Sequence, residues 1–528
     1  MPKQTLLYIG LLFAGTMHAQ TSAVHGDIQV GASTDISSEC EQIDYTYTTE
    51  DARLGTNSGH RYFSDVDDTN RNVHLFYDAD LQVDLHPDHS LAFTLSGTHD
   101  WLHTVGVREE TIHDAEGNLL SRVQGQYSRP RETGTQLGAG VRYTYRTHRP
   151  GESLSVGYQY RWDHSLHQLI QQVDEATGWN LFTSNIRTQQ TNYRYHHMSL
   201  DYVCPLAKGH ALDLGVCYDR RQIDNQTLIL WDGSSHLDAL YTHLTQYGAL
   251  NARYRMQVGP VQAVAGLEYR ATKMQQRWLH DVLPTAMVKY QIDSVHSLTA
   301  QYRILLIRPE IQHLDTNHIT DAYTQMFGSD ALIGTHAHNV SLTYRMALPR
   351  LTFATEVKYI TASDGINALW IESNDTRLYT WGNEGIRHAV SLTPSVDSHL
   401  GETTRLHWDA TVLWDQRIAA AINMSNAQWG IRTAAELEQE LPYAMSLIIN
   451  GEYAYHNTLN LYSYAGHGGS IGVEWQMAFL DRHNLCLSAG YTCGFTPEVH
   501  VVKGGWVGKE IFHPCCFHDV ALHISYTF

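Results

Sequence analysis

Histidines are the side chains of this sequence best suited to bind a metal ion. The chain has 33 of them among 528 residues, and some are closely spaced, such as His196 with His197 and His336 with His338. A neutral imidazole is a common ligand for zinc, copper and haem iron. In an extended strand His336 and His338 would share a face, but no third ligand is in view. A metal or haem surface and a compositional bias both remain open; since nothing fixes a geometry, we predict no metal ligand and no cofactor.

Charged side chains form a second group of candidates. They occur within stretches where polar and apolar residues alternate, and alternate positions of an extended chain point to one side. On a shared face they could select solutes by charge, as charged rings do in pores. The alternative is that they pair with one another in a polar interior. The eight candidates are Arg142, Arg146, Arg161, Asp163, Arg253, Arg255, Glu268 and Arg270.

The cysteines are too few and too scattered to form a scaffold. There are seven, and no paired C-x-x-C set with zinc-finger spacing occurs. Cys493 stands near the end of one expected strand and Cys515 near the start of the last. A disulfide between Cys493 and Cys515 would clamp the connection between them, outside the membrane, where oxidation persists.

The elements that position these residues are long alternating strands. Over residues 136–146 one face carries Leu137, Val141 and Tyr143 while the other carries Arg142 and Arg146. After a turn, residues 153–163 repeat the pattern, so the two segments predict a hairpin. Similar stretches return at 250–258, 261–270 and 519–528.

The length of these strands separates two fold classes. Soluble sandwiches alternate as well, but their strands are usually about five or six residues long. Tilted strands of about ten residues suit a membrane, and aromatic residues near the strand ends suit its interfaces. Short turns also alternate with longer connections, among them 107–133 and 307–336. We predict an all-β protein, a transmembrane antiparallel up-and-down β-barrel of about 20 strands (range about 18–22), with the eight charged candidates facing its lumen.

The termini and the net charge give a location. Residues 1–19 resemble an export signal, with Lys3 before an apolar stretch and Ala19 before the expected cut. Residues 20–528 would then form the barrel, of which 20–71 supply the first strand and possibly a lumen insert. The net charge of −19 argues against nucleic acid as a partner. The expected location is the bacterial outer membrane, with its lipids as partners.

One stretch resembles a known family. It resembles the barrel region of the TonB-dependent receptor-like outer-membrane proteins of the Bacteroidota, in which a strand ending in Arg-Pro precedes a loop with a Gly and a Leu, and a His-Asn strand follows. The residues that carry this resemblance are Ser297, Leu298, Thr299, Ala300, Gln301, Tyr302, Ile307, Arg308, Pro309, Leu314, Asp321, Gly328, Leu332, His338, Asn339, Val340, Ser341, Leu342, Thr343 and Tyr344.

The resemblance implies a receptor-like barrel. The stretch from Gln20 to the first clear strand near Asn72 is short for the plug domain of such receptors, so we expect a barrel without a plug. The expected function is passage or uptake of small nutrients or iron-related ligands. The alternative is a sealed barrel that docks a surface lipoprotein or a neighbouring outer-membrane transporter, with 20–70 or 307–336 as the sealing segment.

Catalysis is the least favoured function. The sequence contains no H-E-x-x-H zinc motif and no Walker loop. Acid and histidine neighbours such as Asp163 and His164 are common in a chain this rich in histidine. We predict no catalytic residue and no enzyme activity, and a hydrolase at the barrel rim is the remaining alternative.

Overall fold

The computed structural model describes residues 24–48, 59–114, 116–178, 184–231, 234–274, 276–316, 319–320, 324–373, 376–419, 424–458, 463–479, 484–495, 499–501, 507–513 and 516–527. The expected export signal, residues 1–19, lies outside this part of the chain, and so does Cys515.

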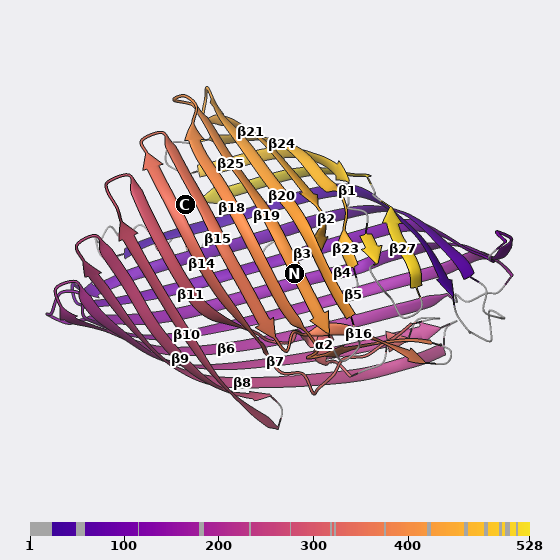
Figure 1. Cartoon of the computed structure of the whole chain (residues 1–528), viewed down its shortest axis with the longest axis horizontal. Helices are drawn as coiled ribbons and strands as arrows, with labels where there is room; N and C mark the ends of the chain where they lie inside the picture. The colour runs from indigo at the N-terminus through magenta and orange to yellow at the C-terminus, as the bar shows by residue number, and fades with distance from the viewer. Residues whose placement is uncertain are drawn as a thin grey trace.

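Within the described residues, 20 antiparallel strands close into one barrel (Figure 1). Each pairs with its neighbours in the sequence, so the topology is up-and-down, and the all-β barrel of about 20 strands is confirmed. The wall strands are β1 (Val24–Thr48), β2 (Gly59–His86), β3 (His89–His113), β4 (Leu119–Arg146), β5 (Ser153–Gly178), β6 (Asn185–Ala207), β7 (His210–Trp231), β8 (Ser234–Val258), β9 (Val261–Met274), β10 (Arg277–Gln291), β11 (His296–Ile307), β14 (Thr335–Leu348), β15 (Leu351–Ser363), β18 (Ile386–His399), β19 (Thr404–Ala419), β20 (Met424–Leu441), β21 (Met445–Tyr455), β24 (Gly468–Phe479), β25 (Asn484–Phe495) and β28 (Cys516–Thr527).

Shorter elements lie in the connections. The helix α2 spans Ile311–Leu314, and among the described residues no helix has the length and apolar character to cross a membrane. The short strands are β12 (Ile319–Thr320), β13 (Thr324–Met326), β16 (Asn367–Ser373), β17 (Thr376–Gly382), β22 (Asn457–Thr458), β23 (Ser463–Ala465), β26 (Val499–Val501) and β27 (Val507–His513). Of these, β12, β13, β16 and β17 form a separate small sheet.

The barrel closes where the first strand meets the last. β1 pairs with β2 on one side and with β28 on the other, for example Ile36 opposite Val520. Closure matters because an open edge would leave backbone donors and acceptors without partners in lipid.

The two faces of the wall differ in chemistry. On β8 and β9 the exposed apolar side chains include Leu250 and Leu267, which are 56% and 52% exposed. The alternate positions carry Arg253, Arg255 and Glu268. Because lipid contacts apolar groups, the apolar face is the outer one and the polar face lines the lumen.

Connection lengths differ in part from expectation. The expected long loop at 107–133 is wrong: β3 runs to His113 and β4 begins at Leu119. There the strands continue past membrane height, pairing in register with two bulges. The long connection at 307–336 is present, since β11 ends at Ile307 and β14 begins at Thr335.

Candidate functional site

The connection between β11 and β14 folds onto the polar face of the wall. We call residues 308–316 and 324–334 of this connection the inward segment. Figure 1 shows α2 at the end of the barrel away from the short turns. The inward segment contacts β7, β8, β9 and β10, at positions that alternate with the outer apolar ones.

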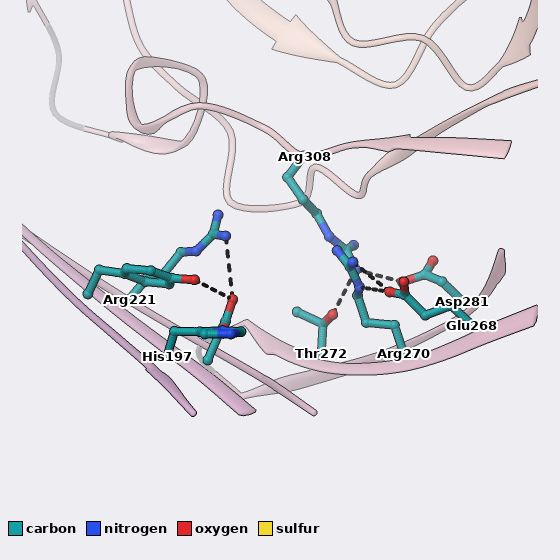
Figure 2. Close-up of polar contacts among 9 residues, drawn as sticks. His197, Arg221, Glu268, Arg270, Thr272, Asp281 and Arg308 are labelled. Atoms are coloured by element: carbon teal, nitrogen blue, oxygen red, sulfur yellow. Dashed lines mark hydrogen bonds and ion pairs between the residues drawn. The ribbon is translucent and has the colours of Figure 1, made fainter. Parts of the chain in front are cut away.

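Arg308 fastens the start of the inward segment to the wall. Its Nη2 donates to Asp281 Oδ2 at 2.6 Å and to Thr272 Oγ1 at 2.7 Å, on β10 and β9 (Figure 2). The other oxygen of Asp281 lies 2.9 Å from His336 Nε2. The Asp281 side chain is only 4% exposed, so this carboxylate is held by two cationic or potentially cationic groups in a shielded place.

Apolar contacts hold the rest of the inward segment. Leu314 and Leu332 pack with Tyr241 of β8 and Met274 of β9 in a buried cluster. At Gly328 a Cβ would come within 2.5 Å of the backbone oxygen of Asp315, so this tight turn requires glycine. The Gly and Leu of the sequence resemblance therefore shape and anchor this segment.

A polar bond and a ring contact add to the docking. Asn225 Nδ2 of β7 donates to Asp315 Oδ2 at 2.7 Å. His313 lies against Trp381 of β17, with ring centroids 4.1 Å apart. The inward segment is thus joined to the wall on one side and to the next connection on the other.

On the polar face of β6, β7, β8 and β9, arginine and tyrosine side chains pack against one another. Arg221 lies over the rings of Tyr195 and Tyr247, at 5.3 and 5.6 Å from their centroids, and Arg270 lies 4.6 Å from that of Tyr247. Asp219, fully buried, accepts from Tyr195 at 3.0 Å and contacts His197. These cation–π and charged contacts keep the planar groups in fixed positions.

The eight charged candidates fall into pairs and single positions. Arg161 donates to Asp163 at 2.9 Å and Arg270 to Glu268 at 2.6 Å, each two residues away on the same strand. Arg255 donates to Asp213 at 2.6 Å.

The remaining three are held more loosely. Arg142 lies 3.9 Å from Asp201, and Arg146 stands at the end of β4 with its backbone N bonded to Asp88 O. Arg253 lines a hollow with Asp213, Asn251, Glu268, Arg270 and Thr285. Five of the eight candidates are thus in close ion pairs, and selection of solutes by the other three stays a prediction.

The cysteines and metal candidates can be placed in part. No disulfide joins Cys204, Cys217, Cys486 and Cys493 to one another; because Cys515 lies outside the described residues, its bridge to Cys493 stays a prediction. Over the part of the chain that the structure describes, no group of three or more His, Cys, Asp or Glu side chains is arranged to hold a metal ion.

Sequence reasoning missed several residues of this site. Arg308 is marked in the sequence only by the family resemblance, and Asp219, Asp281 and Asn225 carry no signal, because their partners lie on other strands.

A hydrolase pattern also occurs in the sequence. Residues 468–472 read Gly-Gly-Ser-Ile-Gly, the pattern of a hydrolase nucleophile elbow, which needs a sharp strand-to-helix turn. Here the pattern lies inside β24 and has no such turn.

The closed sheet, its apolar outer face and its polar lumen define a transmembrane β-barrel of the bacterial outer membrane. The chain belongs to the outer membrane protein β-barrel family, whose model matches residues 145–489. No curated protein matches the chain.

Solved structures share the fold. A mutant of the ferric enterobactin receptor PfeA of Pseudomonas aeruginosa is similar at a TM-score of 0.56 and 12% identity, over 96% of this chain and 80% of that one. The ferric preacinetobactin receptor BauA of Acinetobacter baumannii gives 0.55 and 10%, over 95% and 80%. The siderophore receptor PirA of P. aeruginosa gives 0.50 and 11%, over 96% and 81%. The expected receptor-like barrel is confirmed at the level of the fold.

Proposed function

We propose that this barrel takes up a small nutrient or an iron-related ligand across the outer membrane, through a lumen that the inward segment narrows. The observation that carries the proposal is the docking of this segment by Arg308 on Asp281. Noncovalent contacts alone hold the segment: the ion pair of Arg308, a few hydrogen bonds, a ring contact and a small apolar cluster. In this proposal they can break and re-form. The fold shared with receptors for ferric siderophores supports the ligand class.

Within the lumen, the loosely held cations are our candidates to contact the solute. Arg142 and Arg253 lie on the polar face, and Arg253 lines a hollow. Arg161 and Arg270 are neutralised by near neighbours, so their role in this proposal is to support the wall. An anionic solute would be attracted to the first two more than to the others.

Conductance in a planar bilayer tests the proposal. We would compare the native protein with Arg308→Ala and with Arg405→Ala, whose guanidinium lies 3.9 Å from Glu438 on the wall, away from the inward segment. We expect rare or small openings for the native protein and for R405A, and longer or larger openings for R308A. Identical traces for all three would contradict a gating role for this segment.

The second candidate is a sealed barrel that docks a surface lipoprotein or a neighbouring transporter. It is favoured by the same segment, because three kinds of contact hold it in the lumen. Docking would be supported over uptake by two results together: no conductance from either the native protein or R308A, and copurification of one outer-membrane protein with the barrel.

A further inference from the structure

The outer face of the barrel carries a repeated pair of side chains, a tyrosine hydrogen-bonded to a histidine. In the described strands nine such pairs join Tyr Oη to His Nδ1 at 2.5–3.0 Å. Their ring centroids are 5.9–6.3 Å apart. Tyr269 and Tyr491, for example, are 41% and 46% exposed on the apolar face.

All nine pairs have the same geometry. The histidine stands two residues before the residue that lies opposite the tyrosine in the neighbouring strand. Tyr302 is opposite Val340 and bonds His338, and Tyr344 is opposite Leu298 and bonds His296. A device repeated with one register is not a compositional accident, and it accounts for a share of the 33 histidines.

The pairs form two tiers. Six lie toward the long connections: Tyr158 with His196, Tyr269 with His280, Tyr302 with His338, Tyr359 with His388, Tyr453 with His467 and Tyr491 with His518. Three lie beside the short turns: His89 with Tyr143, His210 with Tyr254 and His296 with Tyr344. We call these the loop-side tier and the turn-side tier.

The spacing of the tiers fits the two edges of a membrane. β11 and β14 carry one pair of each tier, and six residues separate the tiers along each strand, about 20 Å before strand tilt is counted. An outer-membrane barrel has an apolar band about 25 Å tall. The tiers therefore lie just inside its edges, where tyrosine and histidine tips can reach the headgroups.

The hydrogen bond decides what each histidine offers to the lipid. A neutral ring has two tautomers, and our proposal uses the one in which Tyr Oη–H donates to Nδ1, which leaves the imidazole proton on Nε2. That N–H would cost free energy in hydrocarbon unless an oxygen accepted it. The acceptors within reach are the phosphate and ester oxygens of the lipid.

Cationic side chains stand beside one pair of the loop-side tier. His196 lies opposite Arg220, and both Arg220 and Arg194 are exposed on the outer face. Lys273 shares the outer face of β9 with Tyr269, four residues further from the short turn. A chain with a net charge of −19 thus presents positive charge at this height, which is complementary to phosphate.

We propose that the loop-side tier binds the phosphate groups of outer-membrane lipids, with Nε2–H donors from the paired histidines and with Arg194 and Arg220 as charge partners. The tier would hold the barrel at one depth and gather phosphate-bearing lipid around it.

Bilayers with and without phosphate test this proposal. The native protein would be reconstituted in phosphatidylglycerol and in digalactosyldiacylglycerol of the same chain length, and its thermal unfolding midpoint measured. The test variant is H280F/H338F/H388F, which keeps rings on the lipid face and removes the donors. The control is H86F/H148F/H399F, three histidines beside the short turns and outside both tiers.

We expect the native protein and the control to unfold at a higher temperature in the phosphate lipid, and the test variant to lose at least half of that difference. The second variant, R194Q/R220Q, leaves every pair intact and should lose a smaller part. If the triple variant does not fold, Y269F/Y302F/Y359F takes its place. This variant keeps the histidines but removes the tyrosine hydroxyl from Nδ1, so that the ring proton can lie on either nitrogen. A difference between the two lipids that is unchanged in all these variants would overturn the proposal.

Discussion

Buried carboxylates are the residues on which the polar face depends. Asp219, Asp281 and Asp415 are each at most 5% exposed, and each has an arginine within 4 Å. A buried charge without a partner is strongly unfavourable, so removal of one member costs more than the pair contributes. These positions tolerate change poorly although they lie beside a wide lumen.

Asp415 of β19 gives a clear case for mutation. It accepts two bonds from Arg387, at 3.0 and 2.8 Å, and lies 3.8 Å from Arg417. We expect Asp415→Ala to lower the free energy of unfolding by about 2 kcal/mol, since Arg387 keeps some access to water. Urea midpoints in lipid vesicles measure this. Asp397→Ala is the control, because Asp397 is 62% exposed beside His407; an equal loss in both would contradict the account.

His313 of α2 makes the docking of the inward segment depend on pH. Burial lowers the pKa of His313 below its usual value of 6.5, an effect that Glu310 partly offsets. Nδ1 also accepts from the backbone N of Glu310 at 3.0 Å, a bond that protonation removes. The contribution of the neutral ring is complete above pH 6.5 and is lost as the pH falls through the lowered pKa.

Hydrogen exchange of residues 308–316 measures this dependence. We expect exchange to quicken between pH 7.5 and pH 5 more than the intrinsic rates require. In His313→Asn, which has no titrating ring, the excess should vanish. An excess that persists in this variant would assign the dependence to another group.

Among the elements, β1 has the most demanding position, because it lies between β2 and β28. At Gly31 a Cβ would come within 2.4 Å of the Phe76 ring and 2.7 Å of the Ile524 backbone oxygen. Phe76 of β2 crosses this glycine and stacks on His523 of β28, with centroids 5.6 Å apart. An aromatic ring thus bridges the last joint of the barrel across a strand that offers no side chain there.

We expect Gly31→Val to hinder closure, since its side chain would take the place of the Phe76 ring. The altered protein should form less of the folded, heat-modifiable species in outer-membrane fractions. Gly401→Val is the control, because a Cβ at Gly401 meets nothing within 4 Å. Normal yields of folded G31V would show that the bridge is dispensable.

The sequence predicted the elements well where a periodic pattern was present. Alternation around Val141 and Leu250 located the wall strands, and the turn residues near Gly151 and Gly259 located the short turns. It did not predict that β3 and β4 extend past the membrane, because beyond the apolar band nothing distinguishes a strand from a polar loop. The Tyr–His pairs did leave a signal, histidine two residues before an apolar residue, but its meaning requires the register.

For the whole molecule, the fold was predictable and the site only in part. Charges such as Glu268 and Arg270 could be found because they alternate with apolar residues. The docking of Arg308 on Asp281 could not, since 27 residues separate them and the bond depends on how a long connection turns inward. The local sequence determines which face of a strand a side chain occupies. Which other side chain it bonds depends on how the closed barrel brings distant strands together.

Orientation in the membrane follows from the connection lengths. Long connections face outward in outer-membrane barrels and short turns face the periplasm. We expect Glu116→Cys, in the β3–β4 connection, to react with a membrane-impermeant maleimide on intact cells. Glu402→Cys, in the turn after β18, should react only after lysis. The parent protein corrects for native cysteines, and the reverse labelling would invert the assigned orientation.

The walls of the barrel are unequal. β2 and β4 have 28 residues each, whereas β11 and β24 have 12, and each has one end at a short turn. The difference of 16 residues amounts to about 50 Å along the strand. Figure 1 shows the strands near the N-terminus continuing past the others on the side of the long connections. The opening on the side of the long connections is therefore oblique. A solute that approaches over the short strands meets the docked inward segment first, whereas the long strands screen that segment from the opposite side.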